Sequence, residues 1–205
     1  MTSTEDIKRF WCWFSTHKLE LDTMIDSDSA LWTEALAQLQ AIDSRLWFEL
    51  SHPDGAPREF ILTAAGVKDA FPSVEMTIAN APVLPDWQFI ALKPAMGFDF
   101  VTNYEGVELD PKQMWFLPLK SASRPNDFAL RVGVPNLLPE VQRQASNGVL
   151  VILDTALGER SAALDIAHVE VRALPQDPEK VGYVQLPELP RYINWHKRKL
   201  GTTEQ

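Results

Sequence analysis

The chain has little cysteine: Cys12 is the only one among its 205 residues. One cysteine cannot form an intramolecular disulfide, so we expect a fold held by its core alone, in the reducing cytoplasm. Long apolar runs are also missing, since the longest candidate, GVLVILDTALG, is interrupted by Asp154 and falls short of the roughly 18 residues of a membrane span. The first residues, MTSTEDIKRF, are polar and acidic, unlike a signal peptide. These absences predict a soluble cytoplasmic protein.

Positive charge is scarce as well. The formal net charge is -9 at pH 7, which gives the protein a field that repels phosphate backbones and anionic membranes. The one basic cluster, HKRK at 196–199, lies at the end of a predicted helix, where cations offset the negative end of the helix dipole. We therefore expect no direct nucleic-acid binding and no membrane partner.

Signature motifs of catalysis are absent. The sequence contains no phosphate-binding Walker loop, no dinucleotide-binding glycine motif, no HExxH, no CxxC and no GxSxG. The acidic stretch YEGVELD lacks the spacing and the closing glutamate of a calcium loop. Cys12 has no neighbour to stabilise a thiolate, because His17 lies on a different side of the predicted helix. The sequence thus indicates no catalytic residues and no cofactor, and it leaves open whether the protein is an enzyme.

The four histidines are scattered along the chain. His168 and Glu170 share one face of a predicted strand, because side chains alternate with a period of two. Val169 and Val171 then point to the core, so we interpret the polar face as the solvent side rather than as a metal site. No metal site is predicted.

The aromatic stretch RFWCWFSTHK, residues 9–18, predicts an amphipathic helix near the start of the chain, with Ser3 or Thr4 as its cap. Its apolar positions follow helical spacing: Ile7, Phe10, Trp11 and Phe14. We interpret this helix as a lid over one end of a sheet, because buried indoles are strongly stabilising. Ligand stacking by Trp13, Trp87 or Trp195 is the alternative.

The order of predicted elements repeats. The first half is expected to contain a helix starting within 26–29, a hairpin (46–52 and 58–64, turning at PDGAP), a helix (68–81) and a strand (87–93). The second is expected to contain a small hairpin (98–109), a larger hairpin (114–120 and 127–133), a helix (138–157) and a strand (166–173). A proline-rich connector then leads to a final helix from Pro190 to Gly201, and residues 202–205 are expected to fray.

The predicted fold class is α+β: a mixed, largely antiparallel sheet of two ββαβ (ferredoxin-like) units with flanking N- and C-terminal helices. We expect a single globular unit, 1–205, built of halves 1–95 and 96–205. One segment is ambiguous, because Asn147-Gly148 and the following valines also suit a buried strand. Helical spacing across Gly148 and the stop at Gly158 favour a helix over residues 148–154.

The polar interruption LDTALGERSA, residues 153–162, is the most interesting candidate site. Its charged residues are Asp154, Glu159 and Arg160, beside a glycine that permits a sharp turn. The plainer interpretation is a helix terminus with local pairing. The alternative is a binding or acid-base site with a buried carboxyl group, to which Trp13 and Trp87 would contribute stacking surfaces.

The sequence resembles an uncharacterised bacterial family catalogued as a domain of unknown function. The resemblance spans about residues 10–195 and is carried by FWCWF, ILTAAGVKDAFPSV, NAPVLPDWQFIALKP and LDTALGE. It implies no activity. A second likeness, of element order alone, is to the small acidic regulators that inhibit ribonuclease E, and fold analogy does not establish function.

The leading hypothesis is a cytoplasmic, non-catalytic binding or regulatory module that acts through a protein partner. The alternative is a small-ligand-binding protein or hydrolase-like enzyme with a cleft between the two halves. The sequence does not indicate the partner, the substrate or the oligomeric state.

Overall fold

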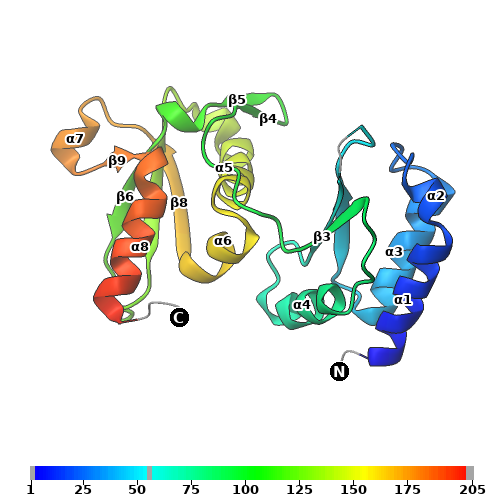
Figure 1. The fold of residues 1–205 in the computed structure, drawn as a ribbon. Helices are drawn as coiled ribbons and strands as arrows, with labels where there is room; N and C mark the ends of the chain where they lie inside the picture. Colours follow the sequence, from blue (N-terminus) through cyan, green and yellow to red (C-terminus); the bar gives the residue numbers. More distant parts are fainter. Residues whose placement is uncertain (1–2, 55–56, 202–205) are drawn as a thin grey trace. The chain divides into compact units, whose positions relative to one another are not determined.

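The computed structural model describes residues 3–54 and 57–201, and the chain divides into two compact units, Met1–Pro94 and Ala95–Gln205 (Figure 1). Each unit has its own sheet and is described separately. The predicted fraying of 202–205 and the centre of the predicted turn PDGAP lie outside the described residues.

The first unit is a three-stranded sheet with helices. Its elements are α1 (Thr4–Thr16), α2 (Lys18–Leu21), α3 (Ala30–Ile42), β1 (Trp47–Leu50), β2 (Arg58–Thr63), η1 (Lys68–Ala70), α4 (Phe71–Ala79) and β3 (Trp87–Ala91). β1 pairs with β2 antiparallel, and β2 pairs with β3 in parallel after the chain has crossed through α4. The predicted order of hairpin, helix and strand is therefore confirmed in this unit.

The aromatic stretch forms α1, whose buried residues are the four predicted from the spacing. Ser3 caps the helix by accepting a hydrogen bond from the backbone N–H of Asp6. The rings of Phe10 and Phe14 lie 6.0 and 5.4 Å from the ring of Phe60, in the central strand β2. The interpretation of α1 as a lid over the end of a sheet is wrong: the helix packs on a face of the sheet, because the aromatic side chains it meets lie in the middle of the strands.

The second unit contains a four-stranded sheet and a separate hairpin. Its elements are β4 (Thr102–Tyr104), β5 (Val107–Leu109), η2 (Pro111–Gln113), β6 (Trp115–Leu119), β7 (Ala129–Val134), η3 (Pro139–Val141), α5 (Gln142–Leu157), α6 (Glu159–Asp165), β8 (His168–Ala173), α7 (Pro178–Val181), β9 (Val184–Gln185), η4 (Leu186–Glu188) and α8 (Leu189–Leu200).

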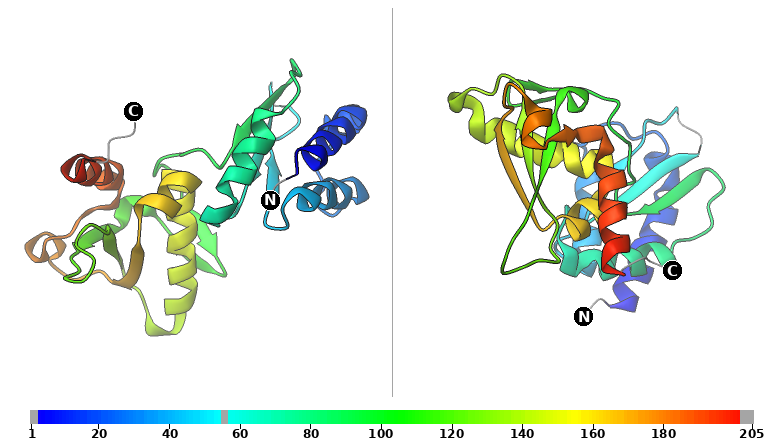
Figure 2. Two further views of the ribbon diagram at one scale, coloured as in Figure 1. Left: turned by 90° about the horizontal axis from the view of Figure 1, so that it is seen from below. Right: turned by 90° about the vertical axis from the view of Figure 1, so that its left-hand side faces the viewer.

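The strand order in the second sheet is β8-β7-β6-β9. β6 and β7 are antiparallel, and β7 and β8 are parallel, so this unit repeats the ββαβ order of the first. The α+β fold is confirmed, but the described strands form three sheets instead of one mixed sheet. Helices α5 (yellow-green) and α8 (red) can be followed in both views of Figure 2.

Residues 148–154 are helical, as favoured, and lie inside α5. Gly148 serves close packing here, not a turn: a Cβ at this position would lie 2.5 Å from Leu109 Cδ1 and 3.1 Å from Tyr104 Cβ. The β4–β5 hairpin thus lies directly against the helix. The backbone turns at Gly158, with φ 78° and ψ 152°, where the helix was expected to end.

The segment interpreted as a proline-rich connector holds three short elements. In it β9 pairs antiparallel with β6, with Gln185 opposite Trp115. A two-residue strand whose partner is about 70 residues away has no periodicity of its own, which is why the sequence did not predict it. The short helices α2 and α6 were missed for the same reason of length.

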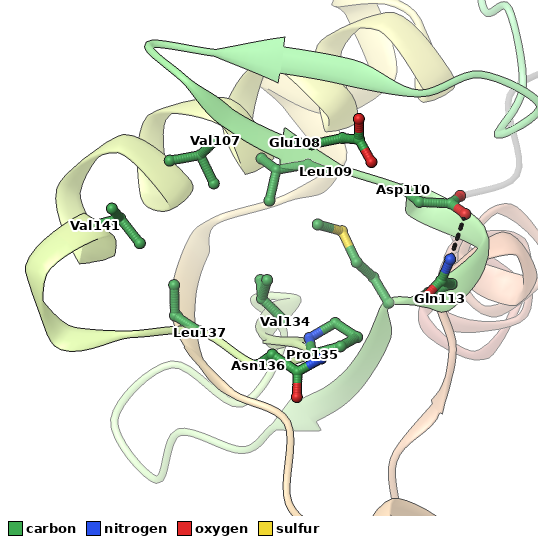
Figure 3. Close-up of a pocket in the computed structure, with 11 residues that line it drawn as sticks. Val107, Glu108, Leu109, Asp110, Gln113, Val134, Pro135, Asn136, Leu137 and Val141 are labelled. Atoms are coloured by element: carbon green, nitrogen blue, oxygen red, sulfur yellow. Dashed lines mark hydrogen bonds between the residues drawn. The ribbon is translucent and has the colours of Figure 1, made fainter.

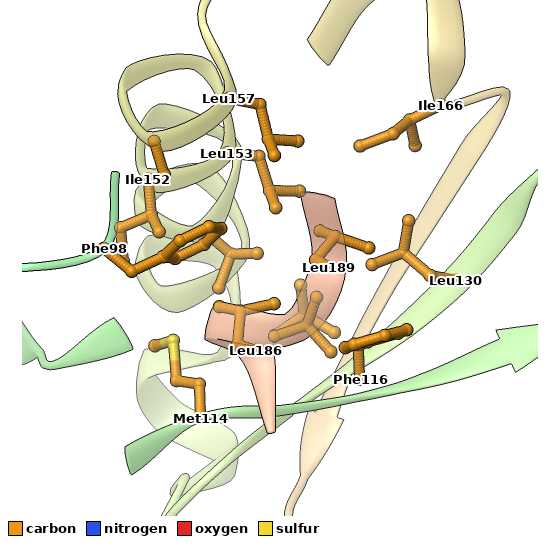
Figure 4. Packing of buried hydrophobic residues seen from close by; sticks show 14 of the residues in the cluster. Phe98, Met114, Phe116, Leu130, Ile152, Leu153, Leu157, Ile166, Leu186 and Leu189 are labelled. Carbon is orange, nitrogen blue, oxygen red and sulfur yellow. The ribbon is translucent and has the colours of Figure 1, made fainter. Parts of the chain in front are cut away.

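The core of the second unit gathers side chains from α5, α8 and the sheet (Figure 4). Ile152 and Leu153 of α5 belong to the same buried cluster as Phe116 and Leu130 of the sheet. Leu189 and Ile193 bury the inner face of α8. The helix therefore presents its other face outward.

Candidate functional site

Two of the five predicted site residues, Trp13 and Trp87, lie in the first unit. Trp87 is 6% exposed, and its indole N–H donates to Asp22 Oδ1 over 2.7 Å. The indole N–H of Trp13 donates to Glu34 Oε1 over 2.7 Å, and its ring stacks on His17 at 4.7 Å. Both indoles are thus engaged within the fold.

The other three predicted residues lie at the junction of α5 and α6 in the second unit. Asp154 is in α5, and Glu159 and Arg160 open α6 after the turn at Gly158. Glu159 is fully buried, while Arg160 is exposed. No site formed within a single unit therefore contains all five residues.

The described parts of the units include three hollows that lie within a single unit. One of about 590 Å³ runs along α1, one of about 280 Å³ lies between α6 and α8, and one of about 320 Å³ lies at the end of β7 (Figure 3). Trp13 borders the first of them. The other four predicted site residues line none of the three.

The hollow along α1 is bordered by Cys12 and His17. Cys12 is exposed. The imidazole of His17 stacks on Trp13, and its Nδ1 lies 2.9 Å from the Trp13 carbonyl oxygen. Both contacts of the His17 imidazole are with Trp13, so the imidazole is not positioned to accept a proton from the Cys12 thiol.

The hollow between α6 and α8 contains titratable groups that pair with their neighbours. Lys197 Nζ lies 2.8 Å from Asp165 Oδ1, and Ser161 donates to the same carboxylate. His196 Nε2 lies 3.0 Å from the carbonyl oxygen of Asn126. These contacts hold α8 against α6 and the loop before β7, so the helix has a defined orientation.

The polar face of β8 is as predicted from the sequence. His168 is exposed, and Glu170 accepts a hydrogen bond from Arg131 Nε over 2.9 Å. This hydrogen bond is the main cause that lowers the pKa of Glu170. Within residues 3–54 and 57–201, no group of three or more His, Cys, Asp or Glu is arranged to hold a metal ion.

The outer face of α8 combines Trp195 with neighbouring cations, which the sequence analysis had considered only separately. We call it the α8 face and define it by Trp195 together with Arg191, Arg198 and Lys199. Each of these cations lies three or four residues from Trp195, and therefore beside it on the helix surface. Trp195 is 46% exposed and lies among the three cations. Lys199 Nζ is 5.4 Å from the centre of its ring.

The charges of the α8 face are little neutralised. Arg191 has one loose contact, 3.6 Å to the exposed Glu188. Arg198 and Lys199 make no ion pair with any residue of the described chain. The helix itself contains four Lys or Arg and no Asp or Glu. The cluster HKRK was visible in the sequence, but reading it as dipole compensation overlooked the exposed indole one helical turn from Lys199.

The described helices include none with the length and apolar character needed to cross a bilayer. No family model matches the chain, and no curated protein or solved structure matches it significantly. The resemblance to an uncharacterised bacterial family and the likeness to ribonuclease E inhibitors stay predictions.

Proposed function

We propose that the protein is a non-catalytic binding or regulatory module, and that its α8 face binds an acidic segment of a protein partner. The observation that carries this proposal is the exposed indole of Trp195 among Arg191, Arg198 and Lys199, on a chain with a net charge of -9. Cytoplasmic location is part of the proposal, supported by the exposed free thiol of Cys12.

Tryptophan and arginine are the residue types that most often dominate protein interfaces. The ring of Trp195 offers apolar surface, and Tyr192 packs against it with ring centres 5.1 Å apart. The surrounding cations attract carboxylates, so they would steer an acidic segment onto the indole and fix its orientation. Charge and apolar contact therefore favour the same partner chemistry.

The helix is already formed and held in place before any partner arrives. Leu189 and Ile193 lie in the core, and Lys197 pairs with Asp165. A preformed binding face loses little conformational entropy on association. This supports α8 as the binding element.

An acidic protein segment fits this face better than a nucleic acid. Residues 95–205 contain 12 Lys or Arg and 14 Asp or Glu, a net charge of -2. Phosphate backbones are bound by extended basic surfaces, and the three cations here make a small one. We therefore propose a protein partner and no direct nucleic-acid contact.

The test uses the full chain and a fluorescein-labelled peptide of Glu, Asp and Leu residues, with binding followed by fluorescence anisotropy. We expect Trp195→Ala and Arg198→Glu each to weaken binding by about tenfold. Raising the salt concentration should weaken it further, because exposed charges are screened.

The matched control is Lys120→Glu, which makes the same charge reversal at an exposed position just after β6. It should leave the affinity nearly unchanged. Equal weakening by the control, or tighter binding of a single-stranded RNA than of the peptide, would overturn the proposal.

A further inference from the structure

The strand β8 is an edge of the second sheet. It is the last strand in the order β8-β7-β6-β9, so among the described strands only β7 pairs with it (Figure 1). An edge strand presents backbone N–H and C=O groups to which a further strand can bind. The carbonyl oxygen of Val171 already accepts a hydrogen bond from Gln142 Nε2 over 3.0 Å. A carbonyl oxygen can accept two hydrogen bonds, so this contact leaves the edge able to pair.

The other sheet edges of the described chain are less suited to pairing. β9 has two residues, and it leaves residues 117–119 of β6 as an edge that contains Pro118. Proline and very short strands are common means of blocking an edge. β1 has four residues with one charge, and β3 has five residues with none. β8 has six residues, no proline and charges of both signs.

The two faces of β8 carry different side chains. Val169 and Val171 point into the core of the unit, whereas Glu170 and Arg172 lie on the opposite face. Arg172 is exposed, and its side chain forms no ion pair or hydrogen bond with any residue of the described chain. Glu170 accepts a hydrogen bond from Arg131 through Oε2, so its other carboxylate oxygen is available to a second cation.

Antiparallel pairing of two copies of β8 about Val171 brings these charges together. In this register Val171 lies opposite Val171 of the second copy, and Glu170 of each copy lies opposite Arg172 of the other. Residues directly opposite in an antiparallel pair share a face, so the valines stay on the core side. Centring the pair on Glu170 or on Arg172 would set like charges opposite each other, and centring it on Val169 would leave Arg172 without a carboxylate. The charge pattern therefore favours one register.

We propose that the protein forms a dimer in which the β8 strands of two copies pair antiparallel about Val171, with a Glu170–Arg172 ion pair at two places across the interface. A twofold axis relates the copies, so pairing uses both edges and growth stops at the dimer. Residues 95–205 have a net charge of -2, against -7 for residues 1–94. Pairing through β8 therefore joins the less acidic units of two chains. No residue of the α8 face takes part, so the two proposals are tested separately.

Sedimentation velocity of the full chain over a range of concentrations measures the dimer. A single strand pair makes a small interface, so we expect a dissociation constant on the order of 100 μM. Arg172→Glu sets glutamates opposite each other at both contacts and should weaken dimerisation about tenfold or more. Arg172→Gln removes the attraction without adding repulsion and should weaken it less.

A mixture of two variants tests the register. Glu170→Arg alone sets arginines opposite each other and should be as weak a dimer as Arg172→Glu. An equal mixture of these two variants restores an opposite charge at both contacts, so it should dimerise like the unaltered protein. Glu170→Arg also loses the hydrogen bond to Arg131, so its fold is checked by circular dichroism. If it fails to fold, the two Arg172 variants decide the proposal.

Lys8→Glu is the matched control, because it reverses an exposed charge on α1 of the first unit. Its dissociation constant should equal that of the unaltered protein. Four results would overturn the proposal: a chain that stays monomeric at concentrations on the order of millimolar, equal weakening by the Lys8 variant, a mixture of folded variants that does not dimerise, or an assembly larger than a dimer.

Discussion

Arg58, at the first position of β2, is the least typical buried residue of the first unit. It is 4% exposed, and its two terminal nitrogens donate hydrogen bonds to the carbonyl oxygens of Leu21 and Met24. The guanidinium also lies 5.4 Å from the ring centre of Trp87. Burial lowers the pKa of Arg58, but a guanidinium stays charged in proteins. One side chain therefore ties the turn after α2 to the sheet.

We expect Arg58→Ala to lower the free energy of unfolding by about 3 kcal/mol, because it removes the charged donors that two buried carbonyl groups share. Arg58→Lys keeps the charge but has no planar fork, so it should lose an intermediate amount. Urea unfolding followed by tryptophan fluorescence measures this, since five of the seven tryptophans lie in residues 1–94. A loss below about 1 kcal/mol for the alanine variant would contradict this role.

Asp43 links three parts of the first unit and makes its stability depend on pH. Its carboxylate accepts hydrogen bonds from Arg45 Nε at 2.8 Å and Nη2 at 2.7 Å, and from the Ser73 hydroxyl at 3.0 Å. The side chain of Arg45 is the main cause that holds the pKa of Asp43 well below its usual range. With the folded pKa depressed, this stabilisation is fully present above an unfolded pKa of about 3.9 and is lost as pH falls toward the folded pKa.

Asp43→Asn should therefore cost about 2 kcal/mol of unfolding free energy near neutral pH, through lost charge-assisted hydrogen bonds. The difference from the unaltered protein should narrow as pH falls below about 4. Urea midpoints at several pH values check this. Glu20→Gln, at an exposed carboxylate, is the control, and its effect on stability should not change with pH in this way. A stability difference between the Asp43→Asn variant and the unaltered protein that stays constant at all pH values would argue against a role of the ionised Asp43.

At the scale of elements, the crossing from β7 to β8 depends on one residue between two helices. Gly158 separates α5 from α6 with φ 78° and ψ 152°, a conformation that is essentially restricted to glycine. The next residue, Glu159, is fully buried. The turn thus sets the direction in which α6 returns toward β8.

Gly158→Ala should destabilise the second unit by about 2 kcal/mol, because a Cβ strains this backbone conformation. Hydrogen exchange of α5 amide groups under native conditions measures the loss. Gly201→Ala is the control: Gly201 also has positive φ, 72°, but ends α8, where fraying should relieve the strain. Comparable destabilisation by both variants would show that the α5–α6 turn has no special role.

The α8 helix shows how one element carries two kinds of surface. Its inner side is fastened by Leu189, Ile193 and the Lys197–Asp165 pair, and its outer side carries Trp195. The three cations in the last turn of α8, Lys197, Arg198 and Lys199, are also favourable for the helix dipole. The position of Lys197 is explained by its stabilising ion pair with Asp165. The exposure of the Trp195 indole has no such explanation, and it is the basis of the proposed function.

At the scale of the whole molecule, the chain consists of two units with similar element order and different charge. Residues 1–94 contain 7 Lys or Arg and 14 Asp or Glu, a net charge of -7, against -2 for residues 95–205. Each unit buries its own aromatic or aliphatic core. The cationic α8 face therefore belongs to the less acidic unit.

We expect fragments 1–94 and 95–205 each to fold alone, because each has its own sheet and core. Amide NMR spectra of the fragments should overlay on that of the full chain, apart from signals near residues 94 and 95. A collapsed spectrum for either fragment would show that its core is insufficient without the other.

Much of the fold could be predicted from local pattern. The spacing of Ile7, Phe10 and Phe14 predicted the buried face of α1, and helical spacing across Gly148 predicted α5 correctly. The β9 strand was missed, because its pairing with β6 depends on a partner far away in the chain. The candidate site was harder to predict. Trp87 was proposed as a stacking surface for a ligand, yet its indole is buried and donates its N–H to Asp22.

The sequence by itself determined the order of helices and strands, since periodic burial is a property of neighbouring residues. Only the tertiary structure decided that Trp195 stays exposed among cations, and that β8 lies at the edge of its sheet. These features depend on which side of each element other segments cover. That is decided by packing between residues distant in the chain, which local spacing does not encode.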